Sequence, residues 1–479
     1  MEKKYDVIIV GSGPAGIFTA YELIKTDPKM DVLLIDKGND IYHRKCPILE
    51  KKRTKCPQDK EGVSGCYPAC SITSGFGGAG AYSDGKFNIT SEFGGWMNEY
   101  YDDEEVERLI EYVDSINLKY GAPHTITDPT TDRVKDIEKR GLATGLKLLR
   151  AKVRHLGTEQ NLTILKRMYE ALREKITMKY KHEVIDLMVE EGTIKGVHCY
   201  DEKRQRHQHY GDNVVIVPGR DGASWLSKIC KNHGIERSCN QVDIGVRVET
   251  NNEIMEEINE HLYEGKFIFR ASVGTTVRTF CSNPSGHVVI ENHSGTMLAN
   301  GHAFKDVRYG SRNTNFALLV SHAFKEPFNQ PNEFAHQVSR LANMLSGGSI
   351  IVQKYGDILA GRRTTEKRLK ESFVTPTLKE AVPGDLGLVL PYNTMKSIIE
   401  MVEALNKVTP GIASEHTLFY GVEAKFYSAR PEMDKSFQSP VKGLYFGGDG
   451  AGITRGLAQA GANGVVIARS IIEKRGHSR

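Results

Sequence analysis

Long hydrophobic runs, net charge and closely paired cysteines are scarce in this 479-residue sequence. No apolar run approaches the roughly 18 residues that a transmembrane helix needs, which argues against a membrane protein. Met-Glu-Lys-Lys leads directly into an apolar segment, so we expect no signal peptide and a cytoplasmic location. A net charge of +4 is small for a nucleic-acid-binding protein. The length predicts two or three domains. The proportions of hydrophobic and charged residues are those of an ordinary globular enzyme.

The eight cysteines do not form an obvious disulfide framework or metal motif. Four of them, Cys46, Cys56, Cys66 and Cys70, are separated by nine, nine and three residues, without a C-x-x-C pair. Iron–sulfur sites usually show tighter spacing, and zinc sites favour pairs two to four residues apart, which only Cys66 and Cys70 satisfy. These two could also form a redox pair. We favour scattered structural thiols and expect no metal.

The most informative segment is the apolar run Val7 to Val10 followed by G-x-G-x-x-G at residues 11–16. The pattern predicts a strand, a tight turn and a helix. Gly11 allows the turn, Gly13 lets the backbone approach a diphosphate, and Gly16 lets the helix pack on the strand. A second apolar strand ends in Asp36, which is placed to accept from ribose hydroxyls. This combination predicts a dinucleotide site; the alternative is an ordinary βαβ turn.

Two further glycine-rich segments follow. Residues 75–86 read Gly-Phe-Gly-Gly-Ala-Gly-Ala-Tyr-Ser-Asp-Gly-Lys, which is too specific for a spacer and is typical of backbone passing close to a planar ligand. Near the C-terminus, a strand at 444–446 precedes Gly-Gly-Asp-Gly-Ala-Gly and a helix rich in small residues. Asp449 there is placed to reach a sugar-alcohol hydroxyl.

The chain between these segments mixes helices and short strands. Amphipathic spacing predicts helices at 103–119, at about 159–176 with Thr158 as N-cap, at 332–345 and at 394–406. Strands are expected at 183–189 and 193–200 as a hairpin, and at 214–217, 242–249, 277–280, 288–292 and 316–320. We find no internal repeat and no second nucleotide fingerprint.

These segments, in this order, resemble the FAD-dependent oxidoreductases of the glutathione-reductase-like structural class. The matches are G-S-G-P-A-G with Asp36, the segment V-I-V-P-G at 215–219, and G-G-D-G-A-G at 447–452. The middle segment departs from the class, which usually has Ala-Thr-Gly there. The resemblance implies that Asp36 holds the adenosine ribose, that Asp449 holds the ribitol, and that the last helix points at the isoalloxazine.

The chain is also similar to a group of bacterial and archaeal FAD-dependent dehydrogenases. The similar segments are G-F-G-G-A-G-A-Y-S-D-G-K, R-H-L-G-T at 154–158, D-I-G-V-R-V-E at 243–249, V-R-T-F-C at 277–281, N-T-N-F-A-L-L-V at 313–320 and G-D-G-A-G-I-T-R-G-L-A-Q-A at 448–460. The resemblance spans most of the chain and names no substrate.

The expected fold is therefore α/β: a discontinuous Rossmann-like FAD-binding domain from residues 1–220 and 431–479, with an inserted α+β substrate domain at 221–430. The expected cofactor is FAD. Cofactor binding is assigned to Gly11, Ser12, Gly13, Pro14, Ala15, Gly16, Asp36, Lys37, Gly77, Gly78, Ala79, Ser83, Asp84, Gly85, Pro218, Gly219, Gly448, Asp449, Gly456, Leu457 and Ala458.

The expected reaction is hydride or electron transfer between the flavin and a small organic substrate. Without a second fingerprint, NAD(P)H is expected only as a transient electron donor. The substrate site is expected where residues 221–430 meet the flavin, with candidates Arg278, His302, Arg363, Lys425, Arg430 and Arg455.

Catalytic roles are assigned to Arg455, Lys425 and Glu423. Arg455 lies at the start of the last helix. Glu423 and Lys425 alternate with apolar residues, so a half-buried strand would point both to one side. Lys425 could then hold an anionic substrate or reduced flavin, and Glu423 could move protons. The alternative for this pair is a solvated sheet face.

Two other functions stay open from the sequence. One is an electron-transfer flavoprotein whose cysteines hold a cluster and whose substrate is a redox partner protein. The other is an FAD-dependent RNA-modifying enzyme, suggested by basic stretches at 44–55 and 203–208. The small net charge speaks against the second, and we expect neither nucleic acid nor a membrane as a partner.

Overall fold

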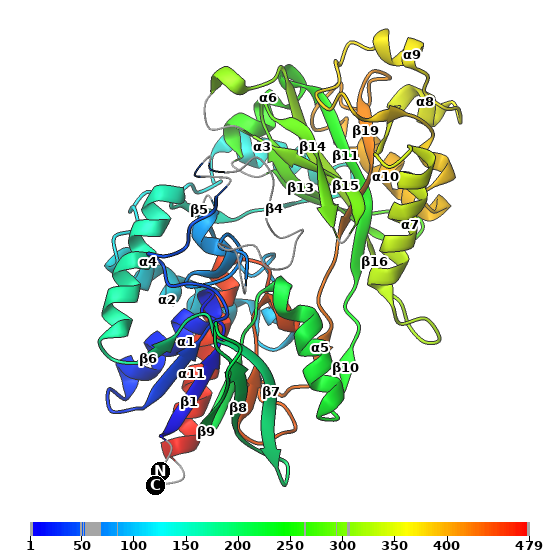
Figure 1. Ribbon diagram of the computed structural model, residues 1–479. Coiled ribbons are helices and arrows are strands. Elements are labelled where there is room, and N and C mark those ends of the chain that lie inside the picture. Colours follow the sequence, from blue (N-terminus) through cyan, green and yellow to red (C-terminus); the bar gives the residue numbers. More distant parts are fainter. Residues whose placement is uncertain are drawn as a thin grey trace. The chain divides into compact units, whose positions relative to one another are not determined.

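The structure is a computed structural model that describes residues 3–47, 50, 52, 69–83, 85–262, 265–293, 295–303 and 307–476. It divides into two compact units. Unit 1 comprises Met1–Asp128, Ala151–Ser238 and Ser428–Arg479. Unit 2 comprises Pro129–Arg150 and Cys239–Tyr427. The beginning and the end of the chain thus belong to the same unit (Figure 1).

Unit 1 is built on a seven-stranded sheet of order β6-β2-β1-β9-β8-β7, in which β21 also pairs with β9. The strands β6, β2, β1, β9 and β21 are mutually parallel, and β7, β8 and β9 form an antiparallel meander. The bounds are Lys4–Val10 for β1, Val32–Ile35 for β2, Thr177–Lys179 for β6, Glu183–Glu190 for β7, Thr193–Tyr200 for β8, Arg206–Ile216 for β9 and Leu444–Phe446 for β21.

The long strand β9 joins the two parts of this sheet. Its first residues pair with β8, whereas residues 214–216 lie between β1 and β21. The parallel strands are almost continuously apolar because both faces of such a sheet are covered, and β2 is buried along its whole length. Because these strands are parallel, the carboxyl ends of β1, β2, β9 and β21 lie along one edge of the sheet.

The helices of unit 1 include α1 (Pro14–Thr26) and α11 (Leu457–Gly476), which pack closely together. A Cβ atom added at Gly464 of α11 would lie 2.1 Å from the carbonyl oxygen of Ala15 in α1. The small residues predicted at the last helix therefore permit this contact. The remaining elements are β3 (Lys86–Ile89), α2 (Asp103–Lys119), β5 (Lys152–His155), α4 (Thr158–Arg173), α5 (Ala223–Asn232), β10 (Arg237–Ser238), β20 (Arg430–Pro431) and the short helices η2 (Gly78–Tyr82), η3 (Met97–Glu99), η4 (Arg220–Gly222) and η7 (Asp449–Ala451).

Unit 2 is built on an eight-stranded sheet of order β18-β17-β19-β11-β16-β13-β12-β4. Every neighbouring pair is antiparallel except β17 and β18. The bounds are Leu146–Leu149 for β4, Val242–Asn251 for β11, Lys266–Arg270 for β12, Thr276–Asn283 for β13, Asn313–His322 for β16, Ile351–Lys354 for β17, Val382–Pro383 for β18 and Leu418–Lys425 for β19.

The two faces of this sheet differ in polarity. On β11, Val242, Ile244, Val246 and Val248 belong to a hydrophobic core shared with helices α3, α6, α7 and α10. The alternating residues Asp243, Arg247 and Glu249 are fully buried on the other face, where the hairpin β14–β15 contacts Arg247. The bounds are Asp132–Leu142 for α3, Asn252–His261 for α6, His287–His293 for β14, Thr296–His302 for β15, Pro331–Leu345 for α7, Tyr355–Leu359 for α8, Glu366–Lys370 for α9, Leu386–Leu388 for η6, Val307–Tyr309 for η5 and Tyr392–Leu405 for α10.

The predicted α/β class is confirmed. The expected elements are present within a few residues of their predicted ends, except that the strand predicted at 214–217 is the end of the longer β9, which begins at Arg206. Thr158 is the first residue of α4, and Gly157 occupies the N-cap position that was predicted for Thr158. The domain limits differ from the expected ones. Residues 129–150 belong to unit 2 because β4 pairs with β12, and the later limits fall after Ser238 and Tyr427 in place of 220 and 430.

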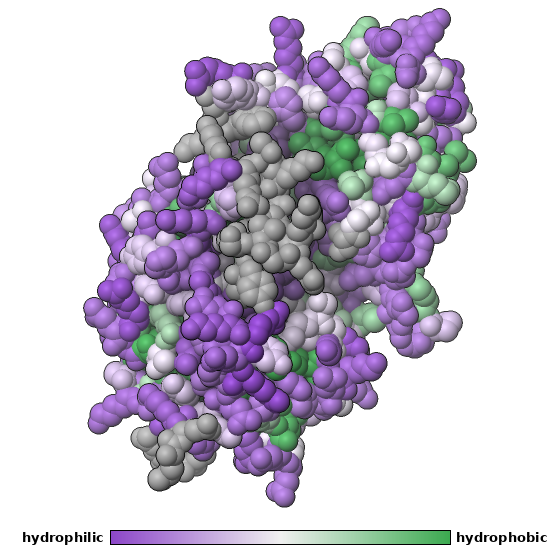
Figure 2. Space-filling model, in the orientation of Figure 1, coloured by the Kyte–Doolittle hydropathy of each residue, from purple (hydrophilic) through white to green (hydrophobic). Residues whose placement is uncertain are grey.

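On the face shown in Figure 2, most of the coloured surface is hydrophilic, with smaller hydrophobic areas on each unit. Within the described part of the chain, none of the helices combines the length and the apolar character needed to cross a bilayer.

Candidate functional site

The glycine turn between β1 and α1 has the geometry of an anion site. Gly11 has φ +108°, and a Cβ atom at Gly16 would lie 1.9 Å from the Gly11 carbonyl oxygen, so neither position tolerates a side chain. At Gly13 the nearest atom to an added Cβ is 4.0 Å away, so space is left above this residue. Among the described residues, no side chain caps the N-terminus of α1. Backbone N–H groups there can therefore bind a diphosphate.

Asp36 lies at the end of β2, beside this turn. Its Oδ2 accepts from the backbone N–H and the hydroxyl of Ser12 at 2.8 and 2.7 Å, and its Oδ1 accepts from the N–H of Gly38 at 2.7 Å. Because a carboxylate oxygen can accept two hydrogen bonds, Oδ1 retains capacity for a ligand hydroxyl. Lys37 forms an ion pair with Asp221 at 2.5 Å.

The glycine-rich loop that begins at Gly75 packs directly on the turn. The N–H of Gly77 donates to the Ser12 carbonyl at 2.8 Å, and a Cβ at Gly78 would lie 3.1 Å from the Gly13 Cα. Gly77 and Gly78 have φ of +89° and +57°, a region that favours glycine. The Ser83 hydroxyl accepts from the Gly85 N–H at 3.2 Å, whereas the predicted site residue Asp84 lies outside the described residues.

The C-terminal segment meets the segment after β9. The N–H of Gly450 donates to the Pro218 carbonyl at 2.9 Å, and that of Gly448 donates to the Asn463 side chain at 2.9 Å. A Cβ at Gly80 would lie 2.5 Å from Cδ2 of Leu457, which places the start of α11 against the glycine-rich loop. The structure thus brings together the described parts of the predicted cofactor-binding segments, at 11–16, 36–37, 77–83, 218–219 and 448–458.

Asp449 is held by two contacts inside unit 1. Thr454 donates its hydroxyl to Oδ1 at 2.9 Å, and the Arg220 guanidinium lies 3.9 Å from Oδ2. Burial raises the pKa of Asp449, although Arg220 and Thr454 oppose this shift. Burial thus disfavours the Asp449 carboxylate, and a further hydrogen bond from a ligand hydroxyl would stabilise it.

We expect Asp449→Asn to stabilise the ligand-free protein more at pH 7 than at pH 4. With a raised pKa, the ionised form costs stability above the ordinary carboxyl pKa of about 3.9, and this cost shrinks as the pH falls to that value. Thermal unfolding of both proteins at the two pH values tests this. An equal difference between the proteins at both values would contradict the assignment of the effect to this carboxyl.

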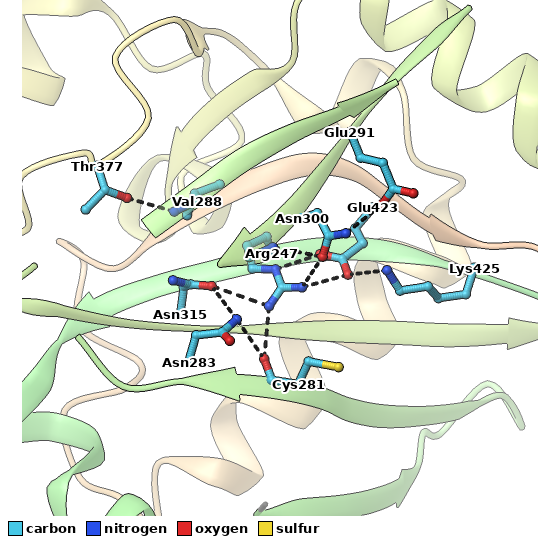
Figure 3. A network of polar contacts seen from close by, with 11 residues as sticks. Arg247, Cys281, Asn283, Val288, Glu291, Asn300, Asn315, Thr377, Glu423 and Lys425 are labelled. Atoms are coloured by element: carbon cyan, nitrogen blue, oxygen red, sulfur yellow. Dashed lines mark hydrogen bonds and ion pairs between the residues drawn. The ribbon is translucent and has the colours of Figure 1, made fainter. Parts of the chain in front are cut away.

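Glu423 and Lys425 lie on the polar face of unit 2, as predicted from their alternation. The Lys425 Nζ is 3.1 Å from Glu423 Oε1, and Glu423 is fully buried. Arg247 donates from Nε and Nη2 to the two oxygens of Glu423 at 2.8 and 2.9 Å, as Figure 3 shows. The pair is thus part of a buried network and not of a solvated face.

The other donors of Arg247 are also used. Nη1 donates to the Cys281 carbonyl at 3.1 Å, and Nη2 donates to Oδ1 of Asn300 in β15 at 3.2 Å. Arg247 was missed from the sequence, although its alternation with Val246 and Val248 indicated a polar position. Only the register of β11 with β19, which pairs Gly245 with Glu423, places Arg247 beside that carboxylate.

The remaining candidates are distributed over both units. Arg455 and Arg430 belong to unit 1, and Arg278, His302 and Arg363 belong to unit 2. The Arg455 N–H donates to the Gly94 carbonyl at 2.9 Å, and Arg430 forms an ion pair with Glu99. Arg363 donates to the Pro383 carbonyl at 3.4 Å.

Only part of the cysteine cluster can be placed. Cys46 and Cys70 are half-buried free thiols, and Cys56 and Cys66 lie outside the described residues. Among the described residues, no group of three or more His, Cys, Asp or Glu side chains is arranged to hold a metal ion. In the basic stretch at 203–208, Arg204 pairs with Glu183 and His207 with Asp201. Part of the stretch at 44–55 lies outside the described residues.

Part of this chain matches a family of FAD-dependent proteins. Residues 241–426 match the model of a family described as "FAD-dependent protein, C-terminal domain-like". An uncharacterized protein of Clostridium beijerinckii is 26% identical over 505 residues, covering 99% of this chain and 82% of that protein. The matched family segment lies within unit 2.

Two solved structures are aligned with the whole chain. Quinol fumarate reductase of E. coli is 13% identical with a TM-score of 0.42, covering 100% of this chain and 72% of that one. Glycerol-3-phosphate dehydrogenase from Bacillus halodurans, complexed with FAD, is 12% identical with a TM-score of 0.38, covering 100% of this chain and 66% of that one.

Proposed function

We propose that this protein is an FAD-dependent oxidoreductase that passes hydride or electrons between bound flavin and a small organic substrate. The observation that carries the proposal is the glycine turn at the N-terminus of α1, where no side-chain hydrogen bond from the N-cap position is formed and where the loop at Gly77 and Gly78 packs against Gly13. The match of residues 241–426 to an FAD-dependent family supports it.

In this proposal each segment of unit 1 holds one part of the dinucleotide. The turn at residues 11–16 binds the diphosphate through backbone N–H groups. Asp36 accepts from the adenosine ribose, and Asp449 accepts from the ribitol. Bound FAD would supply the hydride or electron transfer. NAD(P)H is proposed as a transient electron donor.

We assign the substrate contacts to charged residues named from the sequence. Lys425, which is partly exposed, binds an anionic group of the substrate or stabilises reduced flavin. Because both Glu423 oxygens are bonded by Arg247 and Lys425, the geometry favours a role for Glu423 in orienting Lys425 over proton transfer. Arg455, just before α11, is proposed to act beside the flavin ring.

The purified protein is expected to show two visible flavin bands that bleach on chemical reduction under anaerobic conditions. Absorption spectra before and after reduction, with iron analysis of the same sample, test this. Broad extra absorbance with iron would favour the electron-transfer alternative with a cysteine-bound cluster. A protein that takes up no flavin, even when FAD is added, would contradict the proposed function.

A further inference from the structure

Arg44 is a buried cation surrounded by backbone carbonyl groups. It is 4% exposed. Its Nε donates to the Ser71 carbonyl at 2.9 Å and its Nη2 to the Ile72 carbonyl at 2.6 Å. Its Nη1 donates to the carbonyls of Phe76 and Gly78 at 2.7 and 2.8 Å. Arg44 therefore holds both ends of the segment that leads into the glycine-rich loop.

The charge of Arg44 has no direct counterion among the described residues. All four hydrogen-bond acceptors are neutral carbonyl oxygens, and Tyr82, whose ring lies 5.0 Å from the guanidinium carbon, donates its hydroxyl to the Arg44 carbonyl. Burial lowers the pKa of Arg44, and the Asp36 carboxylate opposes this at longer range. A buried cation without an anion is costly, so an anionic ligand nearby would stabilise it.

Gly78 links Arg44 to the proposed diphosphate site. The Gly78 carbonyl accepts from Arg44, while the Gly78 backbone packs on Gly13. The neighbouring N–H of Gly77 is fixed on Ser12. Through these contacts the guanidinium sets the position of the loop over the turn.

We infer that Arg44 is a positioning residue for the dinucleotide diphosphate, holding the loop at Gly77 and Gly78 on the turn at Gly13 while the diphosphate neutralises its charge. This inference rests on the proposed function, because the ligand is FAD. Arg44 lies outside the glycine motifs of the sequence, so those motifs alone do not indicate a role for it in FAD binding.

The test is FAD titration of the flavin-free protein, followed by quenching of flavin fluorescence. Arg44→Gln is expected to raise the Kd for FAD at least about 30-fold, because it removes a charge and most of the carbonyl contacts. Arg44→Lys is expected to bind FAD at least about tenfold more tightly than Arg44→Gln does, because lysine keeps the positive charge.

Arg154→Gln is the matched control. Arg154 is another buried arginine of unit 1, but its charge is already paired with Asp114 through two bonds of 2.7 Å. This variant is expected to lower the melting temperature while leaving the Kd for FAD within about threefold of the wild-type value. It separates general destabilisation from loss of the site.

Two results would overturn the inference: Arg44→Gln binding FAD within about threefold of wild type, or Arg44→Lys binding no better than Arg44→Gln. If Arg44→Gln does not fold, Arg44→Lys and Tyr82→Phe are compared with wild type instead. If wild type, Arg44→Lys and Tyr82→Phe then bind FAD with equal affinity, the inference about Arg44 is overturned. A wild-type protein that binds no FAD overturns the proposed function itself, whereas unchanged variants of a flavin-binding wild type overturn only the role of Arg44.

Discussion

Replacing Arg247 with methionine is expected to lower the free energy of unfolding by about 3–5 kcal/mol. Arg247 and Glu423 are both fully buried, and two hydrogen bonds of 2.8 and 2.9 Å join them. The substitution leaves the Glu423 carboxylate in the interior with Lys425 as its remaining cationic partner. Urea denaturation of wild type and variant, followed by circular dichroism, measures the difference.

Arg340→Met is the matched control for this experiment. Arg340 lies in the same unit and pairs with Glu333 at 3.2 Å, but both side chains are about half exposed. An exposed ion pair contributes about 0–1 kcal/mol, so this variant should unfold close to wild type. The double variant Arg247→Met, Glu423→Gln should recover part of the loss, because it removes the buried carboxylate that has lost both hydrogen bonds from Arg247. Equal destabilisation by Arg247→Met and Arg340→Met would contradict the buried network.

Gly16→Ala is expected to weaken FAD binding by about 100-fold or more. The added Cβ would lie 1.9 Å from the Gly11 carbonyl oxygen, so α1 must move away from the turn. This movement displaces Gly13 and the first N–H groups of the helix, which form the proposed diphosphate site. Such overpacking also costs about 1–3 kcal/mol of folding free energy. FAD titration and thermal unfolding of the flavin-free protein measure the two effects.

Thr26→Ala serves as the control on the same helix. Thr26 is the last residue of α1 and is exposed, so its replacement should change stability by less than about 0.5 kcal/mol and leave FAD affinity unchanged. The position of the turn as the diphosphate site would be refuted by a Gly16→Ala protein that folds and binds FAD as tightly as wild type.

Local patterns in the sequence were sufficient for the fold class and for the principal segments of the candidate site. The strand, glycine turn, helix and acid between Val7 and Asp36 form one continuous βαβ unit, whose contacts are close in sequence. The amphipathic spacing of residues 103–119 likewise predicted α2 with its observed bounds. Periodicity and turn chemistry are encoded locally, so a single sequence reveals them.

Contacts between distant residues were decided only by the tertiary structure. Arg247 meets Glu423, 176 residues later, because the antiparallel register pairs Glu423 with Gly245, two residues from Arg247 on the same polar face of the sheet. Arg44 binds carbonyls 27 to 34 residues away, and residues 129–150 join unit 2 through the pairing of β4 with β12. Every residue carries a backbone carbonyl, so the sequence does not show which carbonyls a buried arginine will bind. Long-range packing decides which strands pair, so a single sequence does not show the partner of β4 or of β11.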